Sequence, residues 1–142
     1  MILVDANLLI YASVKDFDEH PCARAWLDGR LNGTTRVGLP WESLTTYVRI
    51  VTNPRVFRRP MRAADAMSQV RQWRNRPVSW TPGPTERHEE VFAELLASGG
   101  AQADLVPDAH LGAIAIQHGL TLMSADRDFA RFPGLSWENP LA

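Results

Sequence analysis

Four acidic residues that lie far apart in the sequence occupy positions from which their side chains could meet: Asp5, Glu42, Asp108 and Asp126. Asp5 directly follows the first short apolar run of the chain, and Asp126 comes three residues after the last one. Glu42 and Asp108 lie near the starts of two predicted helices. Because ligand sites of open parallel sheets lie at the carboxyl ends of the strands, we expect the four carboxylates to converge at that edge.

Carboxylates gathered in one place need a counter-ion. Two of them about 4 Å apart repel by roughly 4 kcal/mol at an effective dielectric constant near 20. Oxygen ligands without cysteine or histidine companions favour Mg²⁺ or Mn²⁺ over zinc. Taken singly, each residue could instead be a helix cap, a helix-start charge or a turn former, so the metal-site hypothesis depends on all four being together.

Short apolar runs alternate with helical periodicity along the chain. We expect strands within 2–4, 36–40, 78–81 and 120–123. We expect helices directly after Asp5, over 20–31, 41–52 and 62–74, from a cap at Thr85 to Gly99, over 107–118, and a short one within 125–132. This alternation indicates an α/β fold in which helices cover both faces of a parallel sheet.

Length and charge narrow the class of protein. A chain of 142 residues suits one globular domain, and the single cysteine, Cys22, excludes an intrachain disulfide. The apolar opening run is interrupted by Asp5 and Asn7 and is too short for a membrane span, so we expect a cytoplasmic protein without a membrane segment. Residues 54–77 have a net charge of +6 and residues 78–142 one of −6. This polarity suits a site that handles a polyanion through metal ions, although solvated surfaces would look the same.

Five motifs occur in an order that resembles the PIN-domain nucleases, in particular the VapC toxins of bacterial toxin–antitoxin pairs. They are Val4-Asp5-Ala6-Asn7, Leu39-Pro40-Trp41-Glu42, the segment 49–54, Pro107-Asp108-Ala109-His110-Leu111 and the segment 124–129. The resemblance implies a single PIN domain over 1–142, folded as a three-layer α/β/α sandwich with a mostly parallel sheet. It further implies a type II toxin with Mg²⁺- or Mn²⁺-dependent endoribonuclease activity, a VapB-type antitoxin as inhibitor and a homodimer.

By position, the resemblance makes the four acidic residues the catalytic quartet. We expect Asp5, Asp108 and Asp126 to hold the metal, and Glu42 to orient or deprotonate the attacking water. Asn7 and Ser124 are expected as polar supports and Asp128 as a further nearby acid. Four arginines are expected to bind RNA: Arg49, Arg55, Arg58 and Arg59. Arg49 could equally pair with one of the acids.

Several alternatives stay open at this stage. The same site would serve a PIN-type nuclease acting in RNA processing or on DNA, and a non-catalytic acidic rim could bind a basic peptide. Attack by the ribose 2′-hydroxyl would need a placed histidine pair, which we do not expect, so hydrolysis by water is favoured. The residues His88, His110 and His118 are expected to pack or to form hydrogen bonds rather than to bind metal. Trp41 could stack a nucleic-acid base if it is exposed.

Overall fold

A five-stranded parallel sheet forms the centre of the protein, which is described over residues 1–142 by a computed structural model. Its strands are β1 (Ile2–Val4), β2 (Val37–Gly38), β3 (Ser79–Trp80), β4 (Thr121–Met123) and β5 (Trp137–Glu138). They are ordered β3-β2-β1-β4-β5, and Leu3 of β1 lies in register with Gly38 on one side and Leu122 on the other. All four pairings are parallel, so every strand ends at the same edge.

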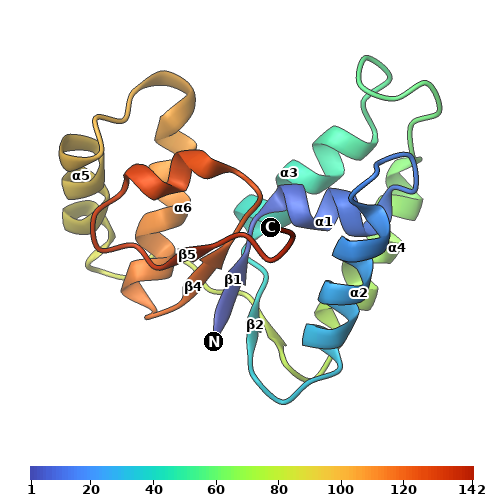
Figure 1. Cartoon of the computed structure of the whole chain (residues 1–142), viewed down its shortest axis with the longest axis horizontal. Helices are drawn as coiled ribbons and strands as arrows, with labels where there is room; N and C mark the ends of the chain where they lie inside the picture. Colours follow the sequence, from blue (N-terminus) through green and yellow to red (C-terminus); the bar gives the residue numbers. More distant parts are fainter.

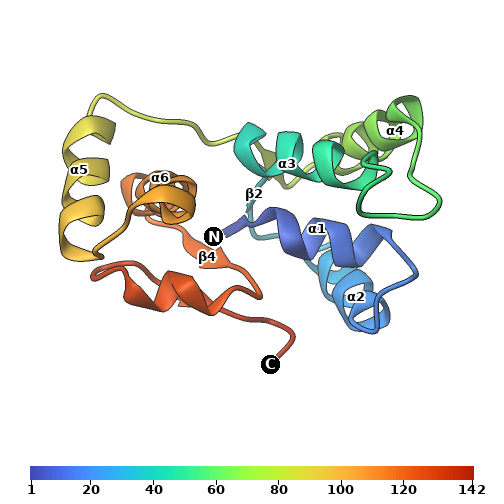
Figure 2. The same ribbon diagram turned by 90° about the horizontal axis from the view of Figure 1, so that it is seen from above.

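Helices cover both faces of this sheet. On one side lie α1 (Ala6–Ser13), α2 (His20–Leu31), α3 (Trp41–Val51) and α4 (Ala63–Arg74). On the other lie α5 (His88–Ser98) and α6 (Val106–Gln117), with the 3₁₀ helices η1 (Ala103–Leu105) and η2 (Arg127–Arg131). Figures 1 and 2 show these three layers from perpendicular directions. The expected α/β/α sandwich is therefore confirmed, and its sheet is entirely parallel.

Alternation along the short strands explains why both faces are buried. Ile2 and Val4 belong to the apolar cluster formed with α1–α4, whereas Leu3 belongs to the cluster formed with α5 and α6. The central strand is therefore apolar at every position, as strands covered on both faces are. Full burial of each such side chain contributes about 1.5–3 kcal/mol to the stability of the fold, and this burial stabilises the packing of both helical layers on the sheet.

Two expectations from the sequence differ from the structure. The tail contains a fifth strand, Trp137–Glu138, which is only partly buried and therefore forms no apolar run. The helix expected from Thr85 begins only at His88, and its N-cap residue makes no side-chain capping bond. Instead, the Thr85 hydroxyl accepts a hydrogen bond from the backbone N–H of Arg87 and donates one to Gln117. Thr85 is thus a turn residue that is bonded to α6.

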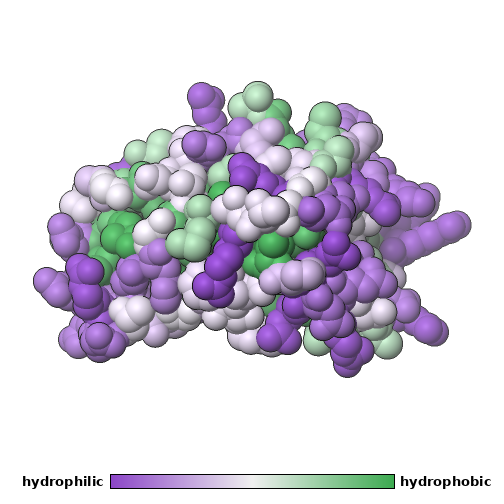
Figure 3. Space-filling model, turned by 90° about the horizontal axis from the view of Figure 1, so that it is seen from below, coloured by the Kyte–Doolittle hydropathy of each residue, from purple (hydrophilic) through white to green (hydrophobic).

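The surface is mostly polar. Figure 3 shows hydrophilic side chains gathered over the end of the molecule formed by α2 and α4, and smaller apolar patches towards the centre and the opposite end. The large hydrophobic side chains that reach solvent are Met1, Trp41 and Val56. None of the helices combines the length and the apolar character that a membrane span requires.

Candidate active site

The predicted acidic residues lie at the carboxyl edge of the sheet. Asp5 follows β1 and caps α1, since its Oδ1 accepts a hydrogen bond of 2.8 Å from the N–H of Ala6. Glu42 and Asp108 lie in the first turns of α3 and α6, where the helix dipole favours negative charge. Asp126 follows β4 and caps η2. The topology thus gathers residues that are up to 121 positions apart in the sequence.

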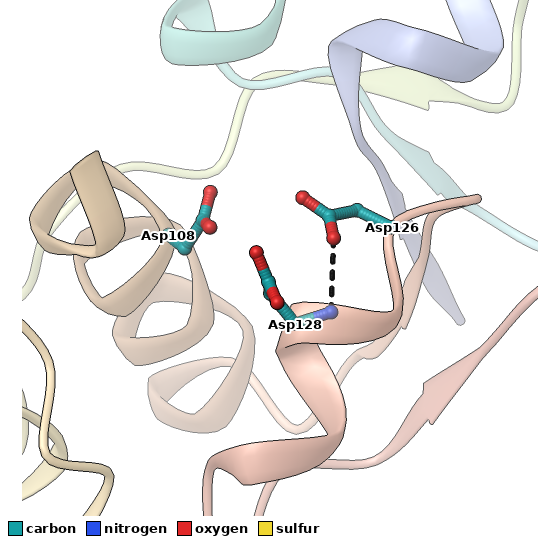
Figure 4. Close-up of side chains that lie close together, drawn as sticks. All are labelled: Asp108, Asp126 and Asp128. Carbon is teal, nitrogen blue, oxygen red and sulfur yellow. Dashed lines mark hydrogen bonds between the residues drawn. The ribbon is translucent and has the colours of Figure 1, made fainter.

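Three of the carboxylates form a close group. One oxygen from each of Asp108, Asp126 and Asp128 lies within 4.8 Å of the other two (Figure 4). Asp126 also accepts a hydrogen bond of 2.9 Å from the N–H of Asp128, which holds the turn between them. Asp128, expected only as a nearby acid, therefore belongs to the same group as Asp108 and Asp126. An all-oxygen donor set of this kind fits Mg²⁺ or Mn²⁺.

Burial and neighbouring charges change the pKa values of two of the aspartates, Asp108 and Asp5. Burial raises the pKa of Asp108 to about 7, and the charges of Asp126, Asp5 and Asp128 add to this effect. Arg131 opposes it. Burial also raises the pKa of Asp5, against the hydrogen bonds from Ser124 and Ala6. Near neutral pH, therefore, the pocket does not keep all its carboxylates charged without a cation.

Ser124 connects the ends of β1 and β4. Its buried hydroxyl donates a hydrogen bond of 2.7 Å to Asp5 and accepts bonds of 3.0 Å from the Asn7 amide and from the N–H of Asp126. The Asn7 amide oxygen in turn accepts from the N–H of Ala125 at 3.3 Å. Ser124 therefore contacts Asp5 and the backbone of Asp126 directly and fixes the orientation of Asp5, and Asn7 supports it through its bond to the Ser124 hydroxyl.

An open pocket of about 670 Å³ adjoins the acidic group. Asp5, Glu42 and Asp108 line it, together with Trp41, Arg49 and His110. Arg49 forms no ion pair with any carboxylate, so its exposed guanidinium is available to a ligand. Trp41 is 45% exposed, and the guanidinium of Arg74 lies 4.8 Å from the centre of its ring.

The other predicted RNA-binding arginines lie outside this pocket. Arg55, Arg58 and Arg59 are exposed on the segment between α3 and α4. Arg58 and Arg59 line a different pocket, of about 490 Å³. This segment follows the far end of α3, and that end, Val51, lies about 14 Å from Glu42 along the helix axis.

Two histidines next to Glu42 were not predicted to contribute to the site. Glu42 accepts a hydrogen bond of 2.7 Å from His110, and His110 contacts His88 at 2.9 Å. Both histidines form hydrogen bonds, as expected, although their closeness to Glu42 was not expected. The pair is arranged in series, and only His110 lines the pocket. The sequence signal for it was the position of His110 two residues after Asp108 and seven before Gln117, which places His110 and Gln117 on one face of α6.

Comparison with known proteins finds a matching family and full-length relatives. The family model of the PIN domain matches residues 2–135. The chain is 41% identical over 142 residues to Ribonuclease VapC37 of Mycobacterium tuberculosis, covering 100% of this chain and 99% of that protein. It is 40% identical over 143 residues to Ribonuclease VapC33 of the same species, covering 99% of each.

Solved structures share the fold. VapBC2 from Rickettsia felis, bound to a DNA fragment from its promoter, matches with a TM-score of 0.69 at 20% identity, covering 98% of each chain. FitAcB from Neisseria gonorrhoeae matches with a TM-score of 0.67 at 20% identity, covering 99% of this chain and 98% of that one.

Proposed function

Because the chain belongs to the PIN-domain family, we propose that it is a VapC-type ribonuclease, the toxin of a type II toxin–antitoxin pair, and that it hydrolyses RNA with Mg²⁺ or Mn²⁺. The observation on which this depends is the group formed by Asp108, Asp126 and Asp128, whose oxygens approach within 4.8 Å of one another. The relatives that match along the full chain are named ribonucleases, which supports RNA rather than DNA as the substrate.

The metal-binding residues follow from the donor set. Asp108, Asp126 and Asp128 would hold the cation, and Asp5 adds a fourth negative charge beside them. When bound, a divalent cation makes water a stronger nucleophile and neutralises charge on the phosphate. Asp5 is itself oriented by Ser124, so its carboxylate keeps one direction without a ligand.

The remaining pocket residues act on water and phosphate. Glu42 accepts a proton from the attacking water, because its carboxylate lines the same pocket as Asp5 and Asp108. Arg49 donates hydrogen bonds to the phosphate, since no carboxylate of the protein engages it. Arg55, Arg58 and Arg59 follow the RNA backbone beyond the cleaved bond.

Attack by water leaves a 5′-phosphate and a 3′-hydroxyl. The alternative, attack by the ribose 2′-hydroxyl, needs an acid and a base on opposite sides of the phosphate. Here His88 has both ring nitrogens in hydrogen bonds to protein groups, so the histidine pair does not provide that arrangement. End-group analysis of cleaved RNA tests this, because 2′,3′-cyclic ends would exclude hydrolysis by water.

A toxin of this kind needs an inhibitor, and we include a VapB-type antitoxin and a homodimer in the proposal. The excess of negative charge in the pocket supports an antitoxin that inserts a cationic side chain in competition with the metal. If the antitoxin inhibits equally well after its arginines are replaced, this mode of inhibition is wrong. Light scattering on the purified toxin tests the dimer.

Cleavage mapping of total cellular RNA with and without Mg²⁺ tests the function itself. We expect defined cuts that require the metal and disappear in Asp108→Asn. Asp65→Asn is the matched control, since Asp65 forms an exposed ion pair with Arg62 on α4. Matched DNA oligonucleotides should remain intact, and metal-dependent cleavage of DNA alone would replace this proposal with a DNA nuclease.

A further inference from the structure

A continuous chain of hydrogen bonds leads from the pocket to the outer helix layer. It runs from Glu42 on α3 through His110 on α6 to His88 at the start of α5, and then through Gln117 to Thr85. Each step is between 2.7 and 2.9 Å. Building on the proposed function, we propose that His110, His88 and Gln117 are positioning residues which hold the Glu42 carboxylate in place for RNA hydrolysis.

Two backbone groups determine the direction of this chain. The N–H of Thr85 can only donate, and it lies 2.8 Å from Gln117 Oε1. The carbonyl of Ala113 can only accept, and it lies 2.9 Å from Gln117 Nε2. The orientation of the Gln117 amide is therefore unambiguous, and Nε2 donates its second hydrogen to His88 Nδ1 at 2.7 Å.

This direction propagates through both imidazoles. Since Nδ1 of His88 accepts, a neutral His88 has its proton on Nε2 and donates to Nδ1 of His110. His110 then has its own proton on Nε2 and donates to Oε2 of Glu42 at 2.7 Å. Oε1 of Glu42 accepts no hydrogen bond from the protein, so it remains free for the attacking water.

The ring of His88 is also held mechanically. It stacks on Phe92 with a centroid distance of 5.5 Å and meets the His110 ring edge-on at 4.6 Å. Burial lowers the pKa of His88, which agrees with a neutral ring in this chain. Removing one link would leave His110 free to change its tautomer or to turn away, and Glu42 would lose its fixed direction.

Matched variants at position 88 test the proposal, with a labelled RNA that contains a mapped cleavage site as the substrate. His88→Phe keeps the stack on Phe92 but removes both ring nitrogens, so we expect kcat to fall roughly tenfold with KM unchanged. His88→Gln can still accept at one end and donate at the other, so it should recover most of the activity. His118→Phe is the control, because the side chain of His118 forms its hydrogen bond with the carbonyl of Gly83, which is not part of the hydrogen-bonded series.

Three kinetic results would overturn the proposal. They are an unchanged kcat in His88→Phe, no recovery in His88→Gln, and an equal loss in the control. Stabilisation of each variant by Mg²⁺ in thermal unfolding shows whether the pocket is intact. A kcat loss accompanied by loss of this stabilisation would mean a general structural role and would also count against the positioning role.

A measurement that needs no RNA separates this proposal from the proposed function. Nitrogen NMR of the imidazoles in the metal-free wild-type protein should show the proton of both His88 and His110 on Nε2. A proton on Nδ1 of His110 would contradict the proposed direction of the hydrogen bonds, independently of which nucleic acid the protein cleaves. The expected tautomers in a protein that cleaves no RNA would instead overturn the proposed function, and with it the catalytic part of this proposal.

Discussion

Replacing Asp108 by asparagine should make the metal-free protein more stable while abolishing its activity. The carboxyl of an aspartate has an ordinary pKa of 3.8, and the pKa of Asp108 is about 7 in the folded, metal-free protein. A raised pKa means that the folded state binds the proton more tightly. This contribution to stability is therefore present at low pH and is lost as the pH rises from about 4 to about 7.

The size of the effect follows from this difference. Each pKa unit corresponds to about 1.36 kcal/mol, so the full shift amounts to about 4 kcal/mol. Because Asp108 is only partly buried, we reduce the figure to about 2 kcal/mol for solvent screening. An asparagine at this position has no charge to bury, so at pH 8 the variant should unfold roughly 4–8 °C higher than the wild type. At pH 4 the wild type and the variant should unfold at nearly the same temperature.

The difference in unfolding temperature between Asp108→Asn and the wild type is measured by circular dichroism at pH 4, 6 and 8, after removal of metals. Adding Mg²⁺ at about 100 times its Kd should stabilise the wild type by about 2.7 kcal/mol and the variant by much less. Asp65→Asn should show neither the pH-dependent gap nor the loss of metal response. If Asp108→Asn is less stable than the wild type at pH 8, or if the gap does not shrink towards pH 4, the carboxylates do not crowd one another as argued.

Three further predictions concern other parts of the site and core. Ser124→Ala leaves Asp5 and two half-buried donors without their partner, so unfolding calorimetry should show a loss of about 1–3 kcal/mol, together with weaker Mn²⁺ binding in titration calorimetry. Tyr47→Phe removes a buried hydroxyl that bonds a serine at 2.7 Å, so denaturant unfolding should show a loss of about 1 kcal/mol, with RNA cleavage unchanged. Replacing Arg58 and Arg59 by alanine should weaken RNA binding and lower the salt slope by roughly 0.7 for each phosphate that is no longer neutralised, as measured by fluorescence anisotropy. An unchanged slope would remove these two arginines from the RNA path.

Periodic burial made most of the fold predictable. The helix over 20–31 has in the structure the bounds that were predicted from the spacing of Ala23, Leu27 and Leu31, because these side chains face the core. Strand β5 consists of the half-buried Trp137 and the exposed Glu138, so it has no apolar run and is defined by its pairing with β4. The equally short strand β2 was predictable because both of its residues are buried within an apolar run.

The same distinction applies to the site. Asp5 and Asp108 could be placed because strand ends and helix starts have sequence signals, and the topology then brings them together. The contact between His88 and His110 joins two helices and depends on the turn at Thr85, which has no periodic signal. The close approach of Asp128 to Asp108 likewise depends on the shape of η2 and was not visible in the spacing.

The helix dipoles that act on these carboxylates do not remove the need for a cation. Asp5, Glu42 and Asp108 each lie at the N-terminus of a helix, where the dipole favours a carboxylate by about 0.3–1 kcal/mol. The penalty on Asp108 is about 2 kcal/mol even after screening; burial is its largest cause, and the charges of three other acids add to it. The dipoles therefore reduce this penalty without cancelling it. The uncompensated negative charge destabilises the metal-free protein, and a bound cation relieves this cost, so the cation binds more tightly. The same carboxylates therefore lower the stability of the metal-free protein and provide the metal site that activity requires.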